Sequence, residues 1–355
     1  MFSENINIID CCKKPEQLTS VYKASPKWTP ADYFGRVKCR VSNSFRMKYK
    51  VEPGLYSLGK PDENSDVFVS ANYKLSFDIL RKELSGLDVW ILVLDTKGIN
   101  VWCAAGKGTF GTKELVKRIN KVELSSILNH GRIIVPQLGA VGVDADAVFR
   151  QTGFKVYFGP VYAKDIKDYL KAGKRKTPEM RKIGFSVIDR LVLTPMEIIP
   201  AIKKFFIFGI IILLFFGLQP SGILFKSAWS YGAPFLLLGL SSIIGGAFIA
   251  PVLLPFIPFR SFAIKGWIIG ILLVVFVLRF LDLSAQKNII IFMADILFFP
   301  MASSYLALQF TGSTTFTNMS GVKKELKIAL PVYLISVAAS IVLLIIYKLH
   351  KSGVI

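Results

Sequence analysis

The chain has 355 residues, of which 52% are hydrophobic and 19% charged, and its 44 Lys and Arg against 24 Asp and Glu give a net charge of +20. A soluble nucleic-acid binder can be this basic, but it rarely has a mean hydropathy of +0.49, so the two properties are expected in different parts of the chain. Residues 1–200 hold 32 basic and 21 acidic residues, whereas residues 201–355 hold 12 and 3 among long apolar runs. The sequence therefore predicts a soluble domain joined to a membrane domain, and no motif in it indicates binding of nucleic acid.

Residues 1–60 are interpreted as an N-terminal extension. The segment Met1–Lys14 lacks the apolar core of a secretory signal peptide, so we expect the soluble half to be cytoplasmic. Cys11 and Cys12 lie in this polar stretch. The pair is compatible with an exposed pair without a role and with capture of a soft metal.

Residues 61–175 alternate short apolar runs with helical patterns, which is typical of a Rossmann-like α/β domain with a parallel sheet. The expected strands are residues 66–70, 89–95, 132–136 and 155–159. The expected helices are residues 77–84, 111–120, 144–151 and 164–171. Ligands of such sheets bind beyond the carboxyl ends of the strands, so the loops after the strands are the candidate site.

The longest of these loops, residues 95–111, contains one cysteine. It does not match a phosphate-binding loop, because Gly98 and Gly106 are eight residues apart and Gly108 stands where a Ser or Thr should bind magnesium. Cys103 precedes small residues and Lys107, and a helix starting here would favour its thiolate, the form that binds metals. From the residues alone, a buried apolar cysteine and a metal ligand are both open.

The other sulfur and imidazole groups offer little chemistry. The four cysteines contain no CxxC pair, so neither a zinc site nor an iron–sulfur cluster can be built from the cysteines of this chain alone. His130 precedes Gly131 and is predicted to lie at a helix end rather than to act as a catalytic base. The basic run at 164–182 is either a docking or lipid-facing patch or a solvated segment beside the membrane.

Residues 176–200 are expected to link the soluble domain to a transmembrane domain, residues 201–355. Its apolar windows predict five spans, at residues 200–218, 232–256, 262–283, 288–309 and 328–348. The second is ambiguous, because four prolines between 234 and 258 predict a kink or a re-entrant end. With five spans and a cytoplasmic soluble half, the loops after the second and fourth spans are also expected on the cytoplasmic side. Together with Lys203 and Lys204 before the first span they carry seven basic residues, against five on the other side. Asp295 is the acid well inside a span, and we expect it to pair with Arg279 or to reach an interface.

The segment Asn100–Lys107, NVWCAAGK, resembles the signature of the corrinoid protein of microbial mercury methylation. The resemblance extends to further segments, which are residues 71–74, 94–98, 108–112, 136–140, 159–161 and 312–321. Val141 is a mild departure, since many relatives are expected to have Pro there. The family implies a corrinoid-binding domain like that of the corrinoid protein of the acetyl-CoA pathway, followed by five membrane helices.

The resemblance also implies a site. Cys103 would be the lower axial ligand of the cobalt of a cobalamin-type corrinoid. The residues implied as a platform under the corrin ring are Asn100, Val101, Trp102, Ala104, Ala105, Gly106 and Lys107. The residues of this and the other loops expected to contact the ring side chains or the nucleotide tail are Asn72, Thr96, Gly108, Thr109, Gln137, Leu138, Gly139, Ala140, Gly159 and Pro160.

The function implied is a corrinoid-dependent methyltransferase in the inner membrane that carries a methyl group on cobalt and transfers it to Hg(II). A strongly donating thiolate would favour departure of the methyl group as a carbanion equivalent or a radical. The implied partners are a methyltetrahydrofolate-linked methyl donor, Hg(II), membrane lipid and a ferredoxin-like protein with two [4Fe-4S] clusters as reductant. The alternatives are a corrinoid methyl carrier with a different physiological acceptor, or a non-enzymatic membrane component that binds or transports metal.

Overall fold

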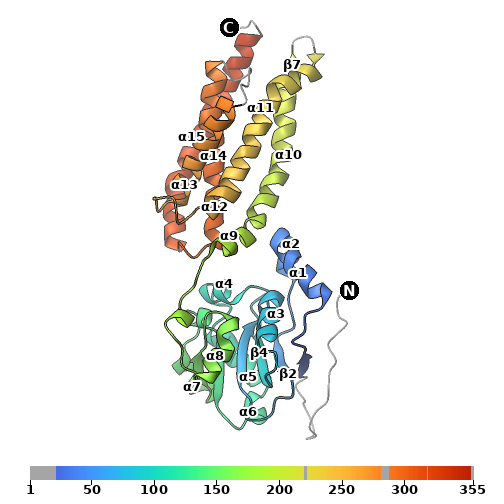
Figure 1. Cartoon of the computed structure of the whole chain (residues 1–355), viewed down its shortest axis with the longest axis vertical. Helices are drawn as coiled ribbons and strands as arrows, with labels where there is room; N and C mark the ends of the chain where they lie inside the picture. The colour runs from blue at the N-terminus through green and yellow to red at the C-terminus, as the bar shows by residue number, and fades with distance from the viewer. Residues whose placement is uncertain (1–20, 220–221, 281–287, 318, 353–355) are drawn as a thin grey trace. The chain divides into compact units, whose positions relative to one another are not determined.

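The structure is a computed structural model that describes residues 21–219, 222–280, 288–317 and 319–352. The chain divides into two compact units, Met1–Ile183 and Gly184–Ile355 (Figure 1). Cys11 and Cys12 lie outside the described residues.

The first unit contains a six-stranded sheet in the order β1-β2-β4-β3-β5-β6. The strands are β1 (Tyr22–Ala24), β2 (Gly54–Leu58), β3 (Val67–Ala71), β4 (Val89–Leu94), β5 (Arg132–Val135) and β6 (Lys155–Phe158). The four predicted strands are β3 to β6, and they pair in parallel. The antiparallel pair of β2 with β4 and the short parallel pair of β1 with β2 extend the sheet beyond the prediction. The predicted parallel α/β fold class is confirmed.

Helices cover both faces of this sheet (Figure 1). The helices of this unit are α1 (Pro30–Val41), α2 (Asn43–Lys48), α3 (Lys74–Glu83), α4 (Val101–Gly106), α5 (Thr112–Lys121), α6 (Leu124–Ile127), α7 (Ala145–Thr152) and α8 (Ile166–Lys171). Successive residues of a strand point to opposite faces, so Val67 and Val69 of β3 join a core with α4, α5 and α7, while Phe68 joins the core with α3 and α8. Both faces are therefore buried, as the continuous apolar runs of these strands require.

The strand order creates a switch point between β3 and β5. From β3 the chain crosses to β4 on one side, and then returns past β3 to form β5 and β6 on the other side. The loops that leave β3 and β5 therefore diverge, which opens a crevice at the carboxyl ends of these two strands.

Among its described residues, the second unit contains five helical segments that are long and apolar enough to cross a membrane, which agrees with the predicted number. These segments are Val187–Gly217, Phe225–Val252, Phe262–Phe280, Ile289–Gly312 and Ser320–Lys351. Their helices are α9 (Val187–Leu193), α10 (Pro195–Gly217), α11 (Phe225–Ile243), α12 (Ala250–Val252), α13 (Phe262–Phe280), α14 (Ile289–Gln309) and α15 (Met319–Lys351). Figure 1 shows the long helices running side by side.

The ambiguous second segment is helical throughout. It begins at Phe225, seven residues before the predicted start, and passes through a π-helical turn, Ile244–Ile249, into α12. Two of its prolines lie within the helices, and Pro255 and Pro258 follow in the connection to α13. A π-helical turn is a place where helices often bend, and the predicted kink and the predicted re-entrant end both stay predictions.

Close packing of α13 on α14 depends on glycine. A Cβ atom at Gly266 would lie 2.4 Å from Cβ of Ala307, and one at Gly270 would lie 2.8 Å from Cα of Pro300. The hydroxyl of Ser303 donates a hydrogen bond of 2.9 Å to the carbonyl of Gly266. Small residues let the two backbones approach, and the hydroxyl bond adds to the contact. Asp295 is fully buried on α14, and its pairing with Arg279 stays a prediction.

Candidate functional site at the carboxyl edge of the sheet

Cys103 lies on α4, directly after the loop that leaves β4. Asn100 caps this helix, since its side-chain oxygen accepts a hydrogen bond of 2.9 Å from the backbone N–H of Cys103. Ala104 and Ala105 are buried against the sheet, whereas Trp102 and Gly106 are exposed and Cys103 is half-buried. Helical spacing therefore presents Trp102, the Cys103 thiol and Gly106 toward the open side of α4.

The loop before α4 is held by Asn72. Its side-chain oxygen accepts hydrogen bonds from the backbone N–H of Thr96 (3.1 Å), the hydroxyl of Thr96 (2.9 Å) and the backbone N–H of Gly98 (2.9 Å). Gly98 has a φ of 75°, a conformation that glycine adopts without strain. Asn72 and Thr96 are both buried, so they shape the loop that positions α4, and their direct contact with a cofactor stays a prediction.

The loop after α4 is locked against the loop after β5. The carbonyl of Ala104 accepts backbone hydrogen bonds from Thr109 and Phe110, and the ring of Phe110 is fully buried. A Cβ atom at Gly139 would lie 2.5 Å from this ring, so only glycine allows the short helix η1 (Gln137–Gly139) to approach it. Gly106 has open space around it instead. Gly139 is therefore needed for close packing against Phe110, whereas Gly106 leaves the surface beside Cys103 unobstructed.

A cavity of about 370 Å³ lies at the switch point. Its wall is formed by β3, β5, α3, the start of α4 and the loop after β6. The predicted site residues that line it are Asn100, Val101, Trp102, Leu138, Gly159 and Pro160. The lining also contains residues that the sequence did not single out, which are Ser76 and Ile79 of α3, Tyr162 and Ala163. Their spacing gave no sign of the site, because only the strand order brings α3 to this crevice.

The remaining predicted residues lie around this cavity. The side-chain oxygen of Gln137 accepts a hydrogen bond from Lys176, which belongs to the segment interpreted as a linker. The Thr109 hydroxyl lies 3.4 Å from the carbonyl of Ala104. Gly108 and Lys107 are exposed beyond the end of α4, and Ala140 is half-buried beyond η1.

Cys103 is the accessible one of the two described cysteines. Cys39 is buried against Tyr73 and Leu75, and this burial raises the pKa of its thiol. Among the described residues no group of three His, Cys, Asp or Glu side chains could hold a metal ion. His130 lies at the opposite edge of the sheet, before β5, and its ring nitrogens contact the backbone of Ser65 and Arg132. A metal at Cys103 would therefore have this thiolate as its single cysteine ligand from the described residues.

Comparison with known proteins identifies relatives of this unit. Residues 43–170 match the family described as the CO dehydrogenase/acetyl-CoA synthase delta subunit. The acetyl-CoA decarbonylase/synthase complex subunit gamma of Archaeoglobus fulgidus is 30% identical over 128 residues, which are 36% of this chain and 27% of that protein. The corrinoid/iron-sulfur protein large subunit of Moorella thermoacetica is 31% identical over 125 residues, which are 35% of this chain and 28% of that protein. The chain thus spans about a quarter of the length of these relatives.

The matched segment contains the whole of the candidate site, from β3 to the loop after β6. Residues 43–170 are a domain homologous to part of the corrinoid/iron-sulfur protein large subunit and of the gamma subunit of the acetyl-CoA decarbonylase/synthase complex.

Proposed function

We propose that this protein is a membrane-bound, corrinoid-dependent methyltransferase that uses Cys103 as the lower axial ligand of cobalt and transfers a methyl group to Hg(II). The observation that carries the proposal is an accessible thiol on the open side of α4, whose first residues Val101 and Trp102 line the cavity at the switch point of a domain homologous to part of a corrinoid protein. When bound, the corrinoid supplies the cobalt atom that carries the methyl group.

The described residues fit such a cofactor. Ligand cavities of about 300–1,000 Å³ enclose drug-sized molecules, so the cavity of about 370 Å³ would take only part of a corrinoid. The rest would lie over the open side of α4, where Gly106 has no side chain and no neighbouring atom occupies the space. A single soft thiolate, with no other metal-binding group formed among the described residues, matches a metal whose remaining ligands come from its own macrocycle.

The residues around the thiol have separate tasks in this proposal. Asn100 and Asn72 fix the start of α4, so the Cys103 sulfur is held in place before the cofactor binds. Trp102 offers an exposed flat ring beside the thiol, and Lys107 offers a positive charge at the end of the helix. These two side chains would contact the macrocycle and its acidic or amide substituents.

Two further features support the proposed acceptor and partner. The segment Asn100–Lys107 resembles the mercury-methylation signature, and Hg(II) is a soft acceptor suited to a methyl group activated by a thiolate ligand. Reduction of the cofactor needs an electron donor, and a [4Fe-4S] cluster takes four cysteines. With Cys39 buried, three of the four cysteines of the chain remain, so a ferredoxin-like partner would supply the clusters.

The five apolar segments support insertion of the second unit in the inner membrane, with the corrinoid domain in the cytoplasm, where a ferredoxin and a methyltetrahydrofolate-linked donor are available. Excess positive charge on the soluble half favours association with an acidic ferredoxin.

Methyl transfer by the purified full chain tests the proposal. The Cys103→Ala variant should lose methylmercury formation, whereas Cys39→Ala, which removes a thiol buried away from the site, should retain it. Both variants are assayed with corrinoid, a chemical reductant, a methyl donor and Hg(II), and methylmercury is quantified. Methylmercury formation by Cys103→Ala at the wild-type rate would contradict the role of the thiol. A wild-type protein that binds corrinoid but gives no methylmercury would contradict the acceptor alone.

A further inference from the structure

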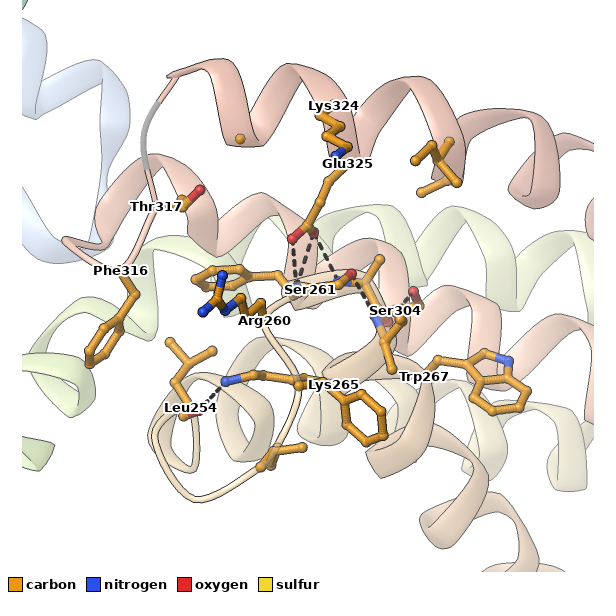
Figure 2. A pocket seen from close by; sticks show the side chains of 18 of the residues that line it. Leu254, Arg260, Ser261, Lys265, Trp267, Ser304, Phe316, Thr317, Lys324 and Glu325 are labelled. Carbon is orange, nitrogen blue, oxygen red and sulfur yellow. Dashed lines mark hydrogen bonds between the residues drawn. The ribbon is translucent and has the colours of Figure 1, made fainter.

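A large open pocket lies at one end of the helices of the second unit. Its volume is about 1420 Å³, and it is lined by the connection between α12 and α13, by the start of α13, by α14 and by the start of α15 (Figure 2). The connection and the start of α15 correspond to the two loops that were expected on the same side of the membrane. The pocket brings their basic side chains together at one end of the membrane helices.

Positive charge predominates in this pocket. Arg260, Lys265 and Lys324 line it, and Glu325 is the one carboxylate among the described lining residues. The Glu325 carboxylate accepts hydrogen bonds from the backbone N–H groups of Phe262 (3.0 Å) and Ala263 (3.3 Å), as Figure 2 shows. It thereby caps the amino end of α13, where a negative charge is favoured. Glu325 is therefore committed to a helix end, and the pocket keeps an excess of basic groups.

Lys265 is a buried basic side chain in the wall of this pocket. It lies in α13 and is 8% exposed, and its amino group donates a hydrogen bond to the carbonyl of Leu254. Arg260 and Lys324 are exposed at the rim. An anion between these three side chains would balance charge that the described neighbours leave in excess.

Apolar side chains continue from the charged end of the pocket along the helices. Trp267 of α13 and Ile328 and Val332 of α15 line the pocket and are 49%, 64% and 56% exposed. Tryptophan is common at the level of lipid headgroups, and exposed Ile and Val suit acyl chains. The pocket thus changes from basic to apolar over its length, which matches a molecule with an anionic head and a hydrocarbon tail.

We propose that this pocket binds the phosphate headgroup of an anionic phospholipid, with Arg260 and Lys324 around the phosphate and an acyl chain along Trp267, Ile328 and Val332. Basic pockets between membrane helices are known sites for such headgroups. A zwitterionic choline headgroup would place a second positive charge beside these residues, so the site should prefer phosphatidylglycerol to phosphatidylcholine. This inference rests on insertion of the second unit in a membrane, as proposed above, and is independent of the corrinoid.

The test uses the full chain purified in a mild detergent and freed of lipid. Phosphatidylglycerol or phosphatidylcholine with identical acyl chains is added, and binding is measured by native mass spectrometry and by the shift of the thermal unfolding midpoint. The double variant Arg260→Gln/Lys324→Gln removes two exposed charges and leaves Lys265 and Glu325 in place. The matched control is Lys226→Gln/Lys351→Gln, which removes two exposed charges at the start of α11 and the end of α15, away from the pocket.

Wild type and control should bind phosphatidylglycerol and be stabilised by it, and the pocket variant should bind it roughly thirtyfold more weakly, a change of about 2 kcal/mol for two basic residues. Equal binding of phosphatidylglycerol by the pocket variant and the control would overturn the site. Equal binding of the two lipids by wild type would overturn the preference for an anionic headgroup. The same stabilisation by inorganic phosphate alone would overturn the lipid as its source. Corrinoid binding, measured on the same samples, separates failure of this proposal from failure of the proposed function.

Discussion

Asn72 decides the shape of the candidate site although it is not on the segment that bears the thiol. It follows β3, and its side-chain oxygen binds three hydrogen-bond donors in the loop after β4. This cross-strand bridge sets where α4 starts and therefore where the Cys103 sulfur lies.

Replacement of Asn72 by Ala should destabilise the first unit by on the order of 3 kcal/mol, because buried donors without partners cost about 1–3 kcal/mol each. The same change should weaken corrinoid binding, since the loop that carries α4 loses its anchor. Thermal unfolding and corrinoid titration of the full chain measure the two effects. Asn64→Ala, at an exposed turn, is the control and should change neither. Unchanged unfolding and unchanged affinity in Asn72→Ala would show that the loop is held by other contacts.

The position of Cys103 could be predicted, because it depends on neighbouring residues in the sequence. Cys103 stands among small residues at a predicted strand end, and the structure places it half-buried on a short helix with an open side. The structural tasks of Asn72 and Gly139 could not be predicted, because each depends on a contact with a loop more than twenty residues away in the chain.

At the scale of elements, a buried charge cluster ties α1 to α3. Arg81 contacts Asp78 at 2.8 Å and Asp32 at 2.9 Å, and Lys74 contacts the same two carboxylates. Burial opposes ionisation of Asp32, but the hydrogen bonds from Lys74 and Thr29 outweigh it and hold the pKa of this carboxyl below its ordinary value of 3.8. The cluster therefore fastens the segment before residue 43, where the family match begins, to the domain.

Removing Arg81 should destabilise the first unit by about 3–5 kcal/mol, since two buried carboxylates would lose a partner. The pH dependence follows from the low pKa of Asp32: its contribution is complete above the ordinary pKa near 3.8 and is lost as the pH falls from there through the lower pKa of the folded state. Unfolding of wild type and Arg81→Ala at pH 7 and at stepwise lower pH measures both. Equal stability of the two proteins at pH 7 would contradict the contribution of the cluster.

The close packing of α13 on α14 predicts that a methyl group at Gly266 lowers the stability of the second unit. Gly266→Ala would place a methyl group 2.4 Å from Ala307, so the helices must separate, and such overpacking costs about 1–3 kcal/mol. Gly312→Ala is the control, because a methyl group there meets no neighbour. Thermal unfolding in detergent should show a lower midpoint for Gly266→Ala only, and equal midpoints would contradict the close packing.

The existence of the elements could be predicted more fully than their arrangement. Continuous apolar runs predicted β3 to β6 and the five membrane segments. A strand buried on both faces and a helix in lipid both require such runs, so both are visible in the sequence. The short strands β1 and β2 lie in segments interpreted as an extension, because their pairing with the sheet depends on distant partners. The switch point also had no local pattern, since it arises from the order in which strands join the sheet.

In our proposal, the first unit lies in water and the second unit lies in the membrane. Five spans would then place the end of α15 on the opposite side of the membrane from the first unit. The test starts from a variant in which all four cysteines are replaced by Ala, and the cells are made permeable in their outer envelope while the inner membrane stays closed. Under this condition, Lys351→Cys should react with a membrane-impermeant maleimide. Lys60→Cys, on the first unit, should react only after the inner membrane is broken. Labelling of both positions under the same condition would contradict five spans.

In the proposed function, the Cys103 thiolate binds the cobalt of a corrinoid. The most direct measurement is the absorption spectrum and cobalt content of the full chain after loading with cobalamin, for wild type, Cys103→Ala and Cys39→Ala. Wild type and Cys39→Ala should share one spectrum with about one cobalt per chain, and Cys103→Ala should show a shifted spectrum or lose the cofactor. A wild-type spectrum and full cobalt content in Cys103→Ala would contradict binding of cobalt by this thiolate.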